Sequence, residues 1–301
     1  MKKIIKYLFP KIYLFLSVIY SRNFNINKKY FKRIFSSNKN YNSLDLSTGL
    51  AVGKFDGNTY LMKCRPSNLI ETSIYRNFNW DNNILTIISS ELSEKREIVL
   101  DIGANIGAIS IALAKKHRNI EFHCFEPSPL VYNDLVFNKS LNNITNLKAI
   151  KFAVSNSTEN KIHFYSQISA NNMGLSSTKL NPDIDEYEKI LVDNISIDEY
   201  ATDLKHRIAV IKIDTQGSEF SVIKSAEETI KKNRPIIFFE FEEEYFKNSD
   251  ERVKNKKDIL EFFHNINYEL YFLNENRFFP LVTFEDYFHG DIISVPTFNK
   301  S

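Results

Sequence analysis

The segment from Ile98 to Gly107 constrains the fold of this chain more than any other part of the sequence. It reads Ile-Val-Leu-Asp-Ile-Gly-Ala-Asn-Ile-Gly, an apolar run that contains an acid and then small residues, and an apolar segment, Ala108 to Lys116, follows it. Glycines at a strand-to-helix turn let a ligand approach the backbone closely, and a helix N-terminus presents free N–H groups. The segment therefore predicts a strand, a nucleotide-binding loop and a helix.

The spacing of this loop favours one class of nucleotide ligand. Dinucleotide folds usually carry G-x-G-x-x-G, with the helix dipole directed at a pyrophosphate. Here three residues separate Gly103 from Gly107, and Asp101 precedes both. An acid at that point suits an ammonium group and repels phosphate. A second predicted strand, Glu121 to Phe125, is followed by Glu126, at the usual distance for an acid that binds ribose hydroxyls. S-adenosylmethionine combines an amino acid with an adenosine, so we expect it as the ligand; the alternative is an ordinary strand-to-helix turn.

Predicted strands and helices alternate through the central part of the chain. This alternation favours an α/β fold with a mostly parallel sheet, helices on both faces and an antiparallel closing pair. Residues Met173 to Glu188 lack periodicity and are expected to form a loop over the active site. The expected strands are Ile98 to Asp101, Glu121 to Phe125, Leu147 to Val154, Lys161 to Tyr165, Ala209 to Asp214, Pro235 to Glu240, Tyr268 to Leu273 and Asp291 to Val295. The expected helices are Asn83 to Lys95, Ile106 to Lys116, Pro129 to Leu141, one from about Ser218, and Lys254 to Asn265.

Charge divides the 301 residues into unequal parts. Residues 1–44 hold ten Lys or Arg and no Asp or Glu, whereas the rest holds 29 basic and 37 acidic side chains. The longest uninterrupted apolar run in this arm, Ile12 to Tyr20, is shorter than the roughly 20 residues that span a bilayer. We therefore expect a basic N-terminal arm (1–44) forming a helical extension, small strands and a helix leading into the core (45–97), and an S-adenosylmethionine-binding domain (98–301). The arm is expected to pack on the domain or on a second copy, or to contact anionic membrane through residues 1–36.

Composition excludes several other classes of protein. The hydrophobic content of 43% and the charged content of 25% are typical of soluble proteins. Cys64 and Cys124 are isolated, without the spacing of a metal site or of a disulfide framework, so a reducing compartment is expected and the cytoplasm is the predicted location. No nucleic-acid recognition module is evident.

Four segments together resemble the FkbM-type methyltransferases. They are Leu100 to Gly107, Phe125 to Ser128, Ile211 to Glu219 and Arg234 to Glu240. The resemblance implies a class I methyltransferase (Rossmann-like) fold, S-adenosylmethionine as methyl donor, and usually a hydroxyl acceptor on a sugar or another secondary metabolite. One departure is visible: the fourth-strand motif of the family often reads Asp-x-Glu-Gly, whereas this chain has Gln216 in place of the glutamate.

The acids that end successive predicted strands are the candidate site residues, because ligands bind beyond the carboxyl ends of parallel strands. Asp214 and Glu240 are the candidate bases for an acceptor hydroxyl, and Glu219 is expected to orient the acceptor. His289, just before the last predicted strand, is a further candidate base, with a structural role as the alternative. No metal is predicted, although clustered carboxylates could hold Mg²⁺ instead. The expected donor-binding residues are Asp101, Gly103, Asn105, Gly107, Glu126, Pro127, Ala153, Val154 and Asp81, where Asp101 and the loop hold the methionine part, Glu126 the ribose, and Ala153 and Val154 the adenine.

The sequence thus predicts an S-adenosylmethionine-dependent O-methyltransferase that acts on a sugar hydroxyl, in the biosynthesis of a surface glycan such as capsule or lipopolysaccharide. The expected partner is a carbohydrate or nucleotide-sugar acceptor, and a homo-oligomer is compatible with the arm. Two alternatives stay open: a methyltransferase for a lipid or amine acceptor, and a non-catalytic protein of the same fold that binds membrane or a partner through its basic arm.

Overall fold

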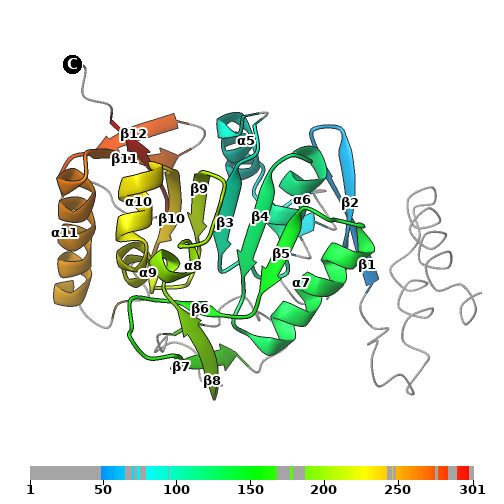
Figure 1. Cartoon of the computed structure of the whole chain (residues 1–301), viewed down its shortest axis with the longest axis horizontal. Helices are drawn as coiled ribbons and strands as arrows, with labels where there is room; N and C mark the ends of the chain where they lie inside the picture. Colours follow the sequence, from blue (N-terminus) through cyan, green and yellow to red (C-terminus); the bar gives the residue numbers. More distant parts are fainter. Residues whose placement is uncertain are drawn as a thin grey trace, which may run out of the picture.

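Eight strands form the central sheet of the computed structural model, in the order β12-β11-β13-β10-β9-β3-β4-β5 (Figure 1). The structure describes residues 49–64, 70, 73–74, 79–93, 95–167, 177–178, 187–242, 246, 249–274, 277–283 and 290–297, so the predicted arm (1–44) lies outside the described residues. The strands are β3 (Ile98–Ile102), β4 (Glu121–Phe125), β5 (Leu147–Ile150), β9 (Ile208–Ile213), β10 (Ile236–Phe241), β11 (Tyr268–Asn274), β12 (Arg277–Leu281) and β13 (Gly290–Pro296).

The directions of these strands confirm the predicted fold class. The strands from β5 through β4, β3 and β9 to β10 are parallel to one another. Strand β13 lies between β10 and β11 and is antiparallel to both, which places the last described strand inside the sheet. Strand β12 is antiparallel to β11, so the sheet is mostly parallel with antiparallel strands at one end, as the resemblance to class I methyltransferases implied.

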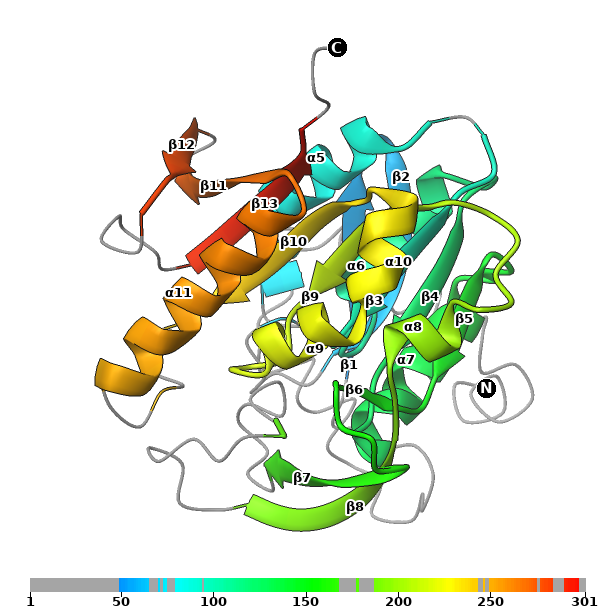
Figure 2. The same ribbon diagram turned by 60° about the vertical axis from the view of Figure 1, so that its left-hand side comes forward.

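Helices cover both faces of the sheet, as the alternation predicted. On one face α5 (Asn82–Glu91), α6 (Ala108–Lys116), α7 (Pro129–Leu141) and the hairpin of β1 (Gly49–Phe55) and β2 (Asn58–Cys64) share one hydrophobic cluster. On the other face α8 (Ile197–Tyr200), α9 (Glu219–Ser225), α10 (Glu227–Asn233) and α11 (Ser249–Asn265) share a second cluster. In Figure 2, α9, α10 and α11 cover the near face of the sheet. Each central strand is therefore buried on both sides, which explains its almost continuous apolar sequence.

A small three-stranded sheet of β6 (Ala153–Val154), β8 (Tyr187–Ile195) and β7 (Lys161–Gln167) lies beyond the carboxyl ends of the parallel strands (Figure 1). The prediction of one strand from Leu147 to Val154 was wrong. Strand β4 ends opposite Ile150, so the chain has no further partner in the main sheet and pairs with β8 instead. Strand β7 was predicted, and it pairs antiparallel with β8.

Three predicted boundaries also differ from the structure. The helix after Ser218 is interrupted at Ala226, which separates α9 from α10. Helix α11 begins at Ser249, whereas the prediction began it at Lys254. The first turn was missed because it is polar and lacks the apolar spacing that marks the rest of the helix. Strand β8 begins at Tyr187, inside the segment expected to be a loop, and Ser177 and Thr178 are the only described residues of residues 168–186.

Side-chain amides of α7 attach the β1–β2 hairpin to the core. Asn142 accepts from the backbone N–H of Leu61 at 2.8 Å and donates to its carbonyl at 2.6 Å, so the amide substitutes for a neighbouring strand. Asn138, which is fully buried, accepts from the N–H of Lys63 at 2.8 Å and donates to the carbonyl of Ile106 at 3.0 Å. The same helix therefore holds both the hairpin and the loop that follows β3.

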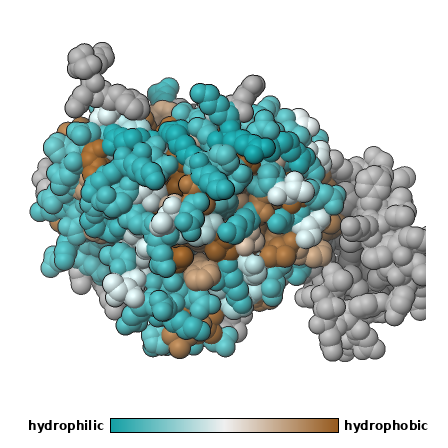
Figure 3. Space-filling model, viewed as in Figure 1, coloured by the Kyte–Doolittle hydropathy of each residue, from teal (hydrophilic) through white to brown (hydrophobic). Residues whose placement is uncertain are grey.

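The face of the molecule in Figure 3 is mainly hydrophilic, and its hydrophobic side chains lie in scattered groups. No helix within the described ranges is both long enough and apolar enough to cross a membrane.

Candidate active site

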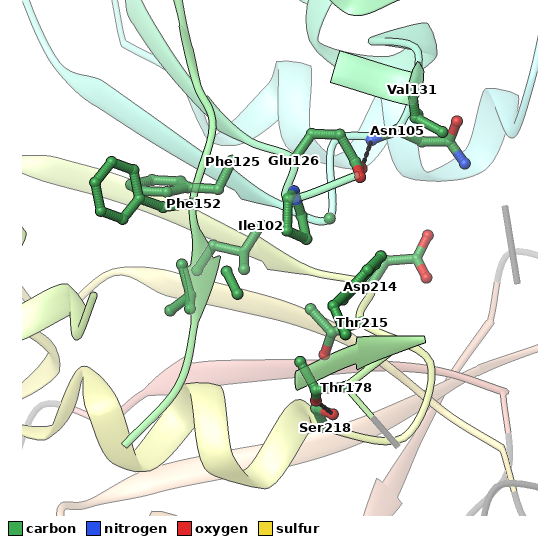
Figure 4. Close-up of a pocket in the computed structure, with 15 residues that line it drawn as sticks. Ile102, Asn105, Phe125, Glu126, Val131, Phe152, Thr178, Asp214, Thr215 and Ser218 are labelled. Atoms are coloured by element: carbon green, nitrogen blue, oxygen red, sulfur yellow. Dashed lines mark hydrogen bonds between the residues drawn. The ribbon is translucent and has the colours of Figure 1, made fainter. Parts of the chain in front are cut away.

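A pocket of about 590 Å³, counting its open mouth, lies at the carboxyl ends of β3, β4 and β9. Figure 4 shows Phe125 and Phe152 at one side of the pocket and Asp214 at the other, with Glu126 between them. The lining residues are Ile102, Gly103, Asn105, Phe125, Glu126, Pro127, Val131, Phe152, Ala153, Val154, Phe164, Thr178, Asp214, Thr215 and Ser218.

Glu126 is fixed in this pocket by two backbone donors. Its Oε2 accepts from the N–H of Asn105 at 3.0 Å, and its Oε1 accepts from the N–H of Ser128 at 2.9 Å. Burial raises the pKa of Glu126 to about 7, although both hydrogen bonds favour the charged form. Each carboxylate oxygen has a second lone pair, so the side chain can still accept two hydroxyl groups.

The loop after β3 requires glycine at position 103. Gly103 has a φ of 76°, and a Cβ built there would lie 1.8 Å from the carbonyl oxygen of Asp214. The chain after β9 thus packs directly against the loop, and the N–H of Asp214 donates to the carbonyl of Ile102 at 2.9 Å. This close approach places Asp214 beside the backbone that forms the pocket.

The loop between β9 and α9 is held by a buried carboxylate. Glu219 Oε1 accepts from the N–H and the hydroxyl of Thr215, each at 3.1 Å, and from the N–H of Gly217 at 3.0 Å. Burial raises the pKa of Glu219. The Ser177 hydroxyl contacts the carbonyls of Thr215 at 3.0 Å and Gln216 at 2.8 Å. The Glu219 carboxylate is therefore directed at its own loop and does not line the pocket.

A row of polar side chains crosses four neighbouring strands on one face of the sheet. Successive side chains of a strand point to opposite faces, so residues two apart share a face. In β3, β9, β10 and β13 the residues that enter the cluster of α5 and α6 are Val99, Val210, Phe238 and Ile293. The polar residues two positions from them are Asp101, Lys212, Glu240 and Asp291, and we call these four residues the carboxyl row. Asp101 pairs with Lys212 across the sheet, and Glu240 pairs with Asp291.

Lys212 is the cation of this row. Its Nζ lies 3.1 Å from Oδ1 of Asp101 and 3.6 Å from Oδ2 of Asp214, and its side chain is 10% exposed. Burial disfavours the ammonium, but the charges of Asp101 and Asp214 outweigh it and raise the pKa of Lys212 above its usual range. Asp101 also accepts from the Ser110 hydroxyl at 2.6 Å. The Asp101 carboxylate is thus bound by groups of the protein itself.

Burial and like charges raise the pKa of two other members of the row. Burial, with Asp214 and Asp291 nearby, raises the pKa of Glu240 to about 9. Burial, with Asp81 and Asp214 nearby, raises the pKa of Asp291 to about 7. At neutral pH Glu240 is therefore mainly protonated, and Asp214, whose side chain is 37% exposed, is the accessible acid at the edge of the pocket.

The structure brings seven of the twelve predicted site residues together around the pocket. They are Gly103, Asn105, Glu126, Pro127, Ala153, Val154 and Asp214. The other five, which do not line it, are Asp101, Gly107, Asp81, Glu219 and Glu240. Their predicted roles toward donor or acceptor stay predictions.

Asp81 begins α5, where its carboxylate accepts from the N–H of Ile84 at 3.0 Å. Burial raises the pKa of Asp81, and the charge of Asp81 raises the pKa of Asp291, so Asp81 lies near the carboxyl row. His289, a further candidate base, lies outside the described residues. Within the described ranges, no group of three or more His, Cys, Asp or Glu side chains is arranged to hold a metal ion.

Sequence reasoning missed Lys212 and Asp291. A lysine in the otherwise apolar run Val-Ile-Lys-Ile was the available signal for the first, because a buried lysine needs an acid nearby. Asp291 could be found only from the register of β13 against β10.

Comparison with known proteins gives one family match. The sequence matches the methyltransferase FkbM domain family over residues 101–270, more than half of the chain. It is similar to "Methyltransferase 1" of Beauveria bassiana (strain ARSEF 2860), with 21% identity over 145 residues, which is 43% of this chain and 58% of that protein.

Two solved structures are also similar. One is methyltransferase FkbM from Methylobacillus flagellatus KT, with 18% identity, 67% of this chain and 44% of that chain covered, and a TM-score of 0.41. The other is TYW2 of M. jannaschii in complex with AdoMet, with 14% identity, 82% and 84% covered, and a TM-score of 0.39. The chain thus spans about half the length of the first curated and the first solved relative.

Proposed function

This chain belongs to the methyltransferase FkbM domain family, and on that premise we propose that it transfers a methyl group from S-adenosylmethionine to a hydroxyl group of a sugar. One observation carries the proposal: Asp214 lines the same pocket as Glu126, at the side opposite to Phe125 and Phe152 (Figure 4). The pocket therefore offers an apolar end, a carboxylate in the middle and a second carboxylate at the far end.

The residues present fit S-adenosylmethionine in that order. Phe125, Phe152 and Val154 would pack on the adenine. Glu126 would accept the ribose hydroxyls through its remaining lone pairs in charge-assisted hydrogen bonds. The backbone around Gly103 and Asn105 would lie beside the methionine part, as the family resemblance implies.

Asp214 would then act on the acceptor. When bound, S-adenosylmethionine supplies a methyl group on a positively charged sulfur. A sugar hydroxyl is a weak nucleophile, so its proton must be removed as the new C–O bond forms. Holding the acceptor oxygen in line with the S–CH₃ bond contributes up to roughly 7–11 kcal/mol in favourable systems. In our proposal Asp214 accepts this proton, because Glu240 already carries one at neutral pH.

The proposal is tested with tritium-labelled S-adenosylmethionine and surface polysaccharide extracted from a strain that lacks the gene; we call this the glycan assay. We expect label in the polysaccharide, and mass spectrometry should place the methyl group on a sugar oxygen. Label on lipid or on nitrogen would contradict the sugar hydroxyl. An amine acceptor is the second candidate, because the carboxyl row could bind a cationic group. No label in any fraction would support a non-catalytic protein.

The pKa of Glu126 predicts how donor binding depends on pH. The ribose hydroxyls donate to the ionised carboxylate, so binding favours the charged form of a group whose pKa is about 7 without ligand. Affinity should therefore rise about tenfold between about pH 6 and about pH 8, with proton release at the lower pH. Calorimetry in buffers of different ionisation enthalpy measures both effects.

Glu126→Gln is the control for this prediction, since it keeps the size of the side chain and removes the titration. The donor's own amino group also titrates, so the difference between wild type and variant reports Glu126 alone. An identical pH dependence in both proteins would exclude Glu126 as the ribose ligand.

We also propose that the protein works in the cytoplasm and that residues 1–36 bring it to anionic membrane. The ten uncompensated basic side chains of residues 1–44 support this proposal. Equal sedimentation of the full chain and a chain without residues 1–36 with anionic vesicles would contradict it.

A further inference from the structure

The one departure from the family motif, Gln216, lies between the two predicted bases. Its Nε2 donates to Oδ1 of Asp214 at 2.9 Å and to Oε2 of Glu240 at 3.3 Å. We propose that Gln216 is a positioning residue whose amide bridges Asp214 and Glu240 and fixes the Asp214 carboxylate at the donor pocket. This inference rests on the proposed function for its consequence in catalysis, but the bridge itself can be tested separately.

The chemistry of an amide suits this bridge. The NH₂ group has two hydrogens and donates both, so it can serve two carboxyl oxygens at once. Because both neighbouring atoms are acceptors, the nitrogen of the amide must face them. A glutamate at position 216 would offer oxygens instead; ionised, it would repel the Asp214 carboxylate, and protonated, it would donate to only one of its two neighbours. The family's usual residue therefore cannot form the same bridge.

The backbone of the loop fixes the direction of the amide. Gln216 has a φ of 57°, a backbone conformation that residues other than glycine rarely adopt. The Ser177 hydroxyl, 3.0 Å from the Thr215 carbonyl, and the Glu219 carboxylate, bonded to the N–H of Gly217, hold the loop on both sides of this residue. Such a conformation persists where surrounding contacts determine it, and here they direct the side chain toward the carboxyl row.

A neutral residue at position 216 also limits the charge of the row. The groups whose charges act on Glu240 are Asp214, Asp291, Glu242 and Glu219, and the cation of the row, Lys212, is paired with Asp101 and Asp214. A further carboxylate at position 216 would add to this repulsion. We expect the added carboxylate to raise the pKa of each acid that it faces.

The test compares Gln216→Glu, which adds a carboxylate of the same size, with Gln216→Met, which removes the donors without adding charge. Asn119→Asp is the matched control, because it adds one charge at an exposed position. Asn119 precedes β4, at the end of the sheet where the parallel strands begin, whereas the carboxyl row lies toward their carboxyl ends. Heteronuclear NMR of the side-chain carboxyl carbons across a pH titration measures Glu240, assigned with Glu240→Gln. Retained chemical shifts of the core methyl groups show that each variant is folded.

We expect the pKa of Glu240 to rise by about 1 in Gln216→Glu, to rise by less in Gln216→Met, and to stay constant in Asn119→Asp. In the glycan assay, the acidic limb of the pH profile of kcat should move up in Gln216→Glu, with little change in KM for the donor. An unchanged Glu240 titration in both folded Gln216 variants would overturn the bridge. A changed pKa of Glu240 with an unchanged acidic limb of the kcat profile would overturn the positioning role. Failure of the wild type in the glycan assay would instead count against the proposed function.

Discussion

Asp214→Asn lowers the turnover of methyl transfer by about 10²–10⁴-fold, the usual contribution of a general base, and leaves the affinity for S-adenosylmethionine nearly unchanged. The asparagine keeps the size of the side chain and can still accept from Gln216, so the loop should retain its geometry. The loss should appear in kcat, because the proton is transferred only as the C–O bond forms. The glycan assay measures turnover, and calorimetry measures donor affinity.

Glu240→Gln is the matched comparison. Glu240 ends the neighbouring strand and, with a pKa of about 9, is already neutral at the pH of the assay, so its amide variant should retain most of the activity. A larger loss in Glu240→Gln than in Asp214→Asn would assign the proton transfer to Glu240. A parallel loss of donor affinity in Asp214→Asn would show that Asp214 binds donor instead.

Lys212→Met lowers the free energy of unfolding by about 3–5 kcal/mol, the cost of leaving one partner of a buried ion pair without the other. Asp101, whose side chain is 2% exposed, loses the ammonium 3.1 Å away, and the Ser110 hydroxyl remains as its donor. For a domain of this size, each kcal/mol corresponds to roughly 2–4 °C in Tm. Urea unfolding followed by circular dichroism measures the free energy directly.

Lys161→Met controls for the loss of a lysine. Its Nζ lies 3.5 Å from Asp193, but both side chains are more than half exposed, so the variant should lose at most about 1 kcal/mol. The double variant Lys212→Met with Asp101→Asn should recover part of the lost stability, because it removes the uncompensated charge. Equal stability of Lys212→Met and wild type would show that the buried pair is not formed.

The fold was predictable from local patterns because the central strands β3, β4, β9 and β10 are mostly apolar and each is marked by a glycine or an acid where it ends. The alternation around Gly103, Glu126 and Asp214 thus predicted the sheet and its carboxyl edge. The end of the strand after Leu147 was not predictable, since Ala153 and Val154 are as apolar as the residues before Ile150. Only the length of β4 determines where that strand leaves the main sheet.

The candidate site was predicted at the carboxyl ends of the strands. The sequence did not predict that the site divides into a pocket and a separate row of polar side chains. Position along the chain placed Glu126 and Glu240 equally well, but it could not show that Glu126 enters the donor pocket while Glu240 faces the cluster of α5 and α6. Similarly, Glu219 comes two residues after Gly217 and was expected to orient the acceptor, yet its carboxylate accepts hydrogen bonds from the backbone of Thr215 and Gly217. The direction of a side chain depends on register and loop conformation, which arise from contacts distant in sequence.

The most direct test of the central claim is calorimetric titration of the full chain with S-adenosylmethionine, beside the same titration of Glu126→Ala. We expect one site per chain in the wild type and an affinity lower by about 1–3 kcal/mol in the variant, the cost of removing an ionised hydrogen-bond acceptor. Because the side chain also accepts from Asn105 and Ser128, the variant's fold should be checked by its unfolding curve. Absence of binding in the wild type, or equal affinity in a folded Glu126→Ala protein, would contradict the account.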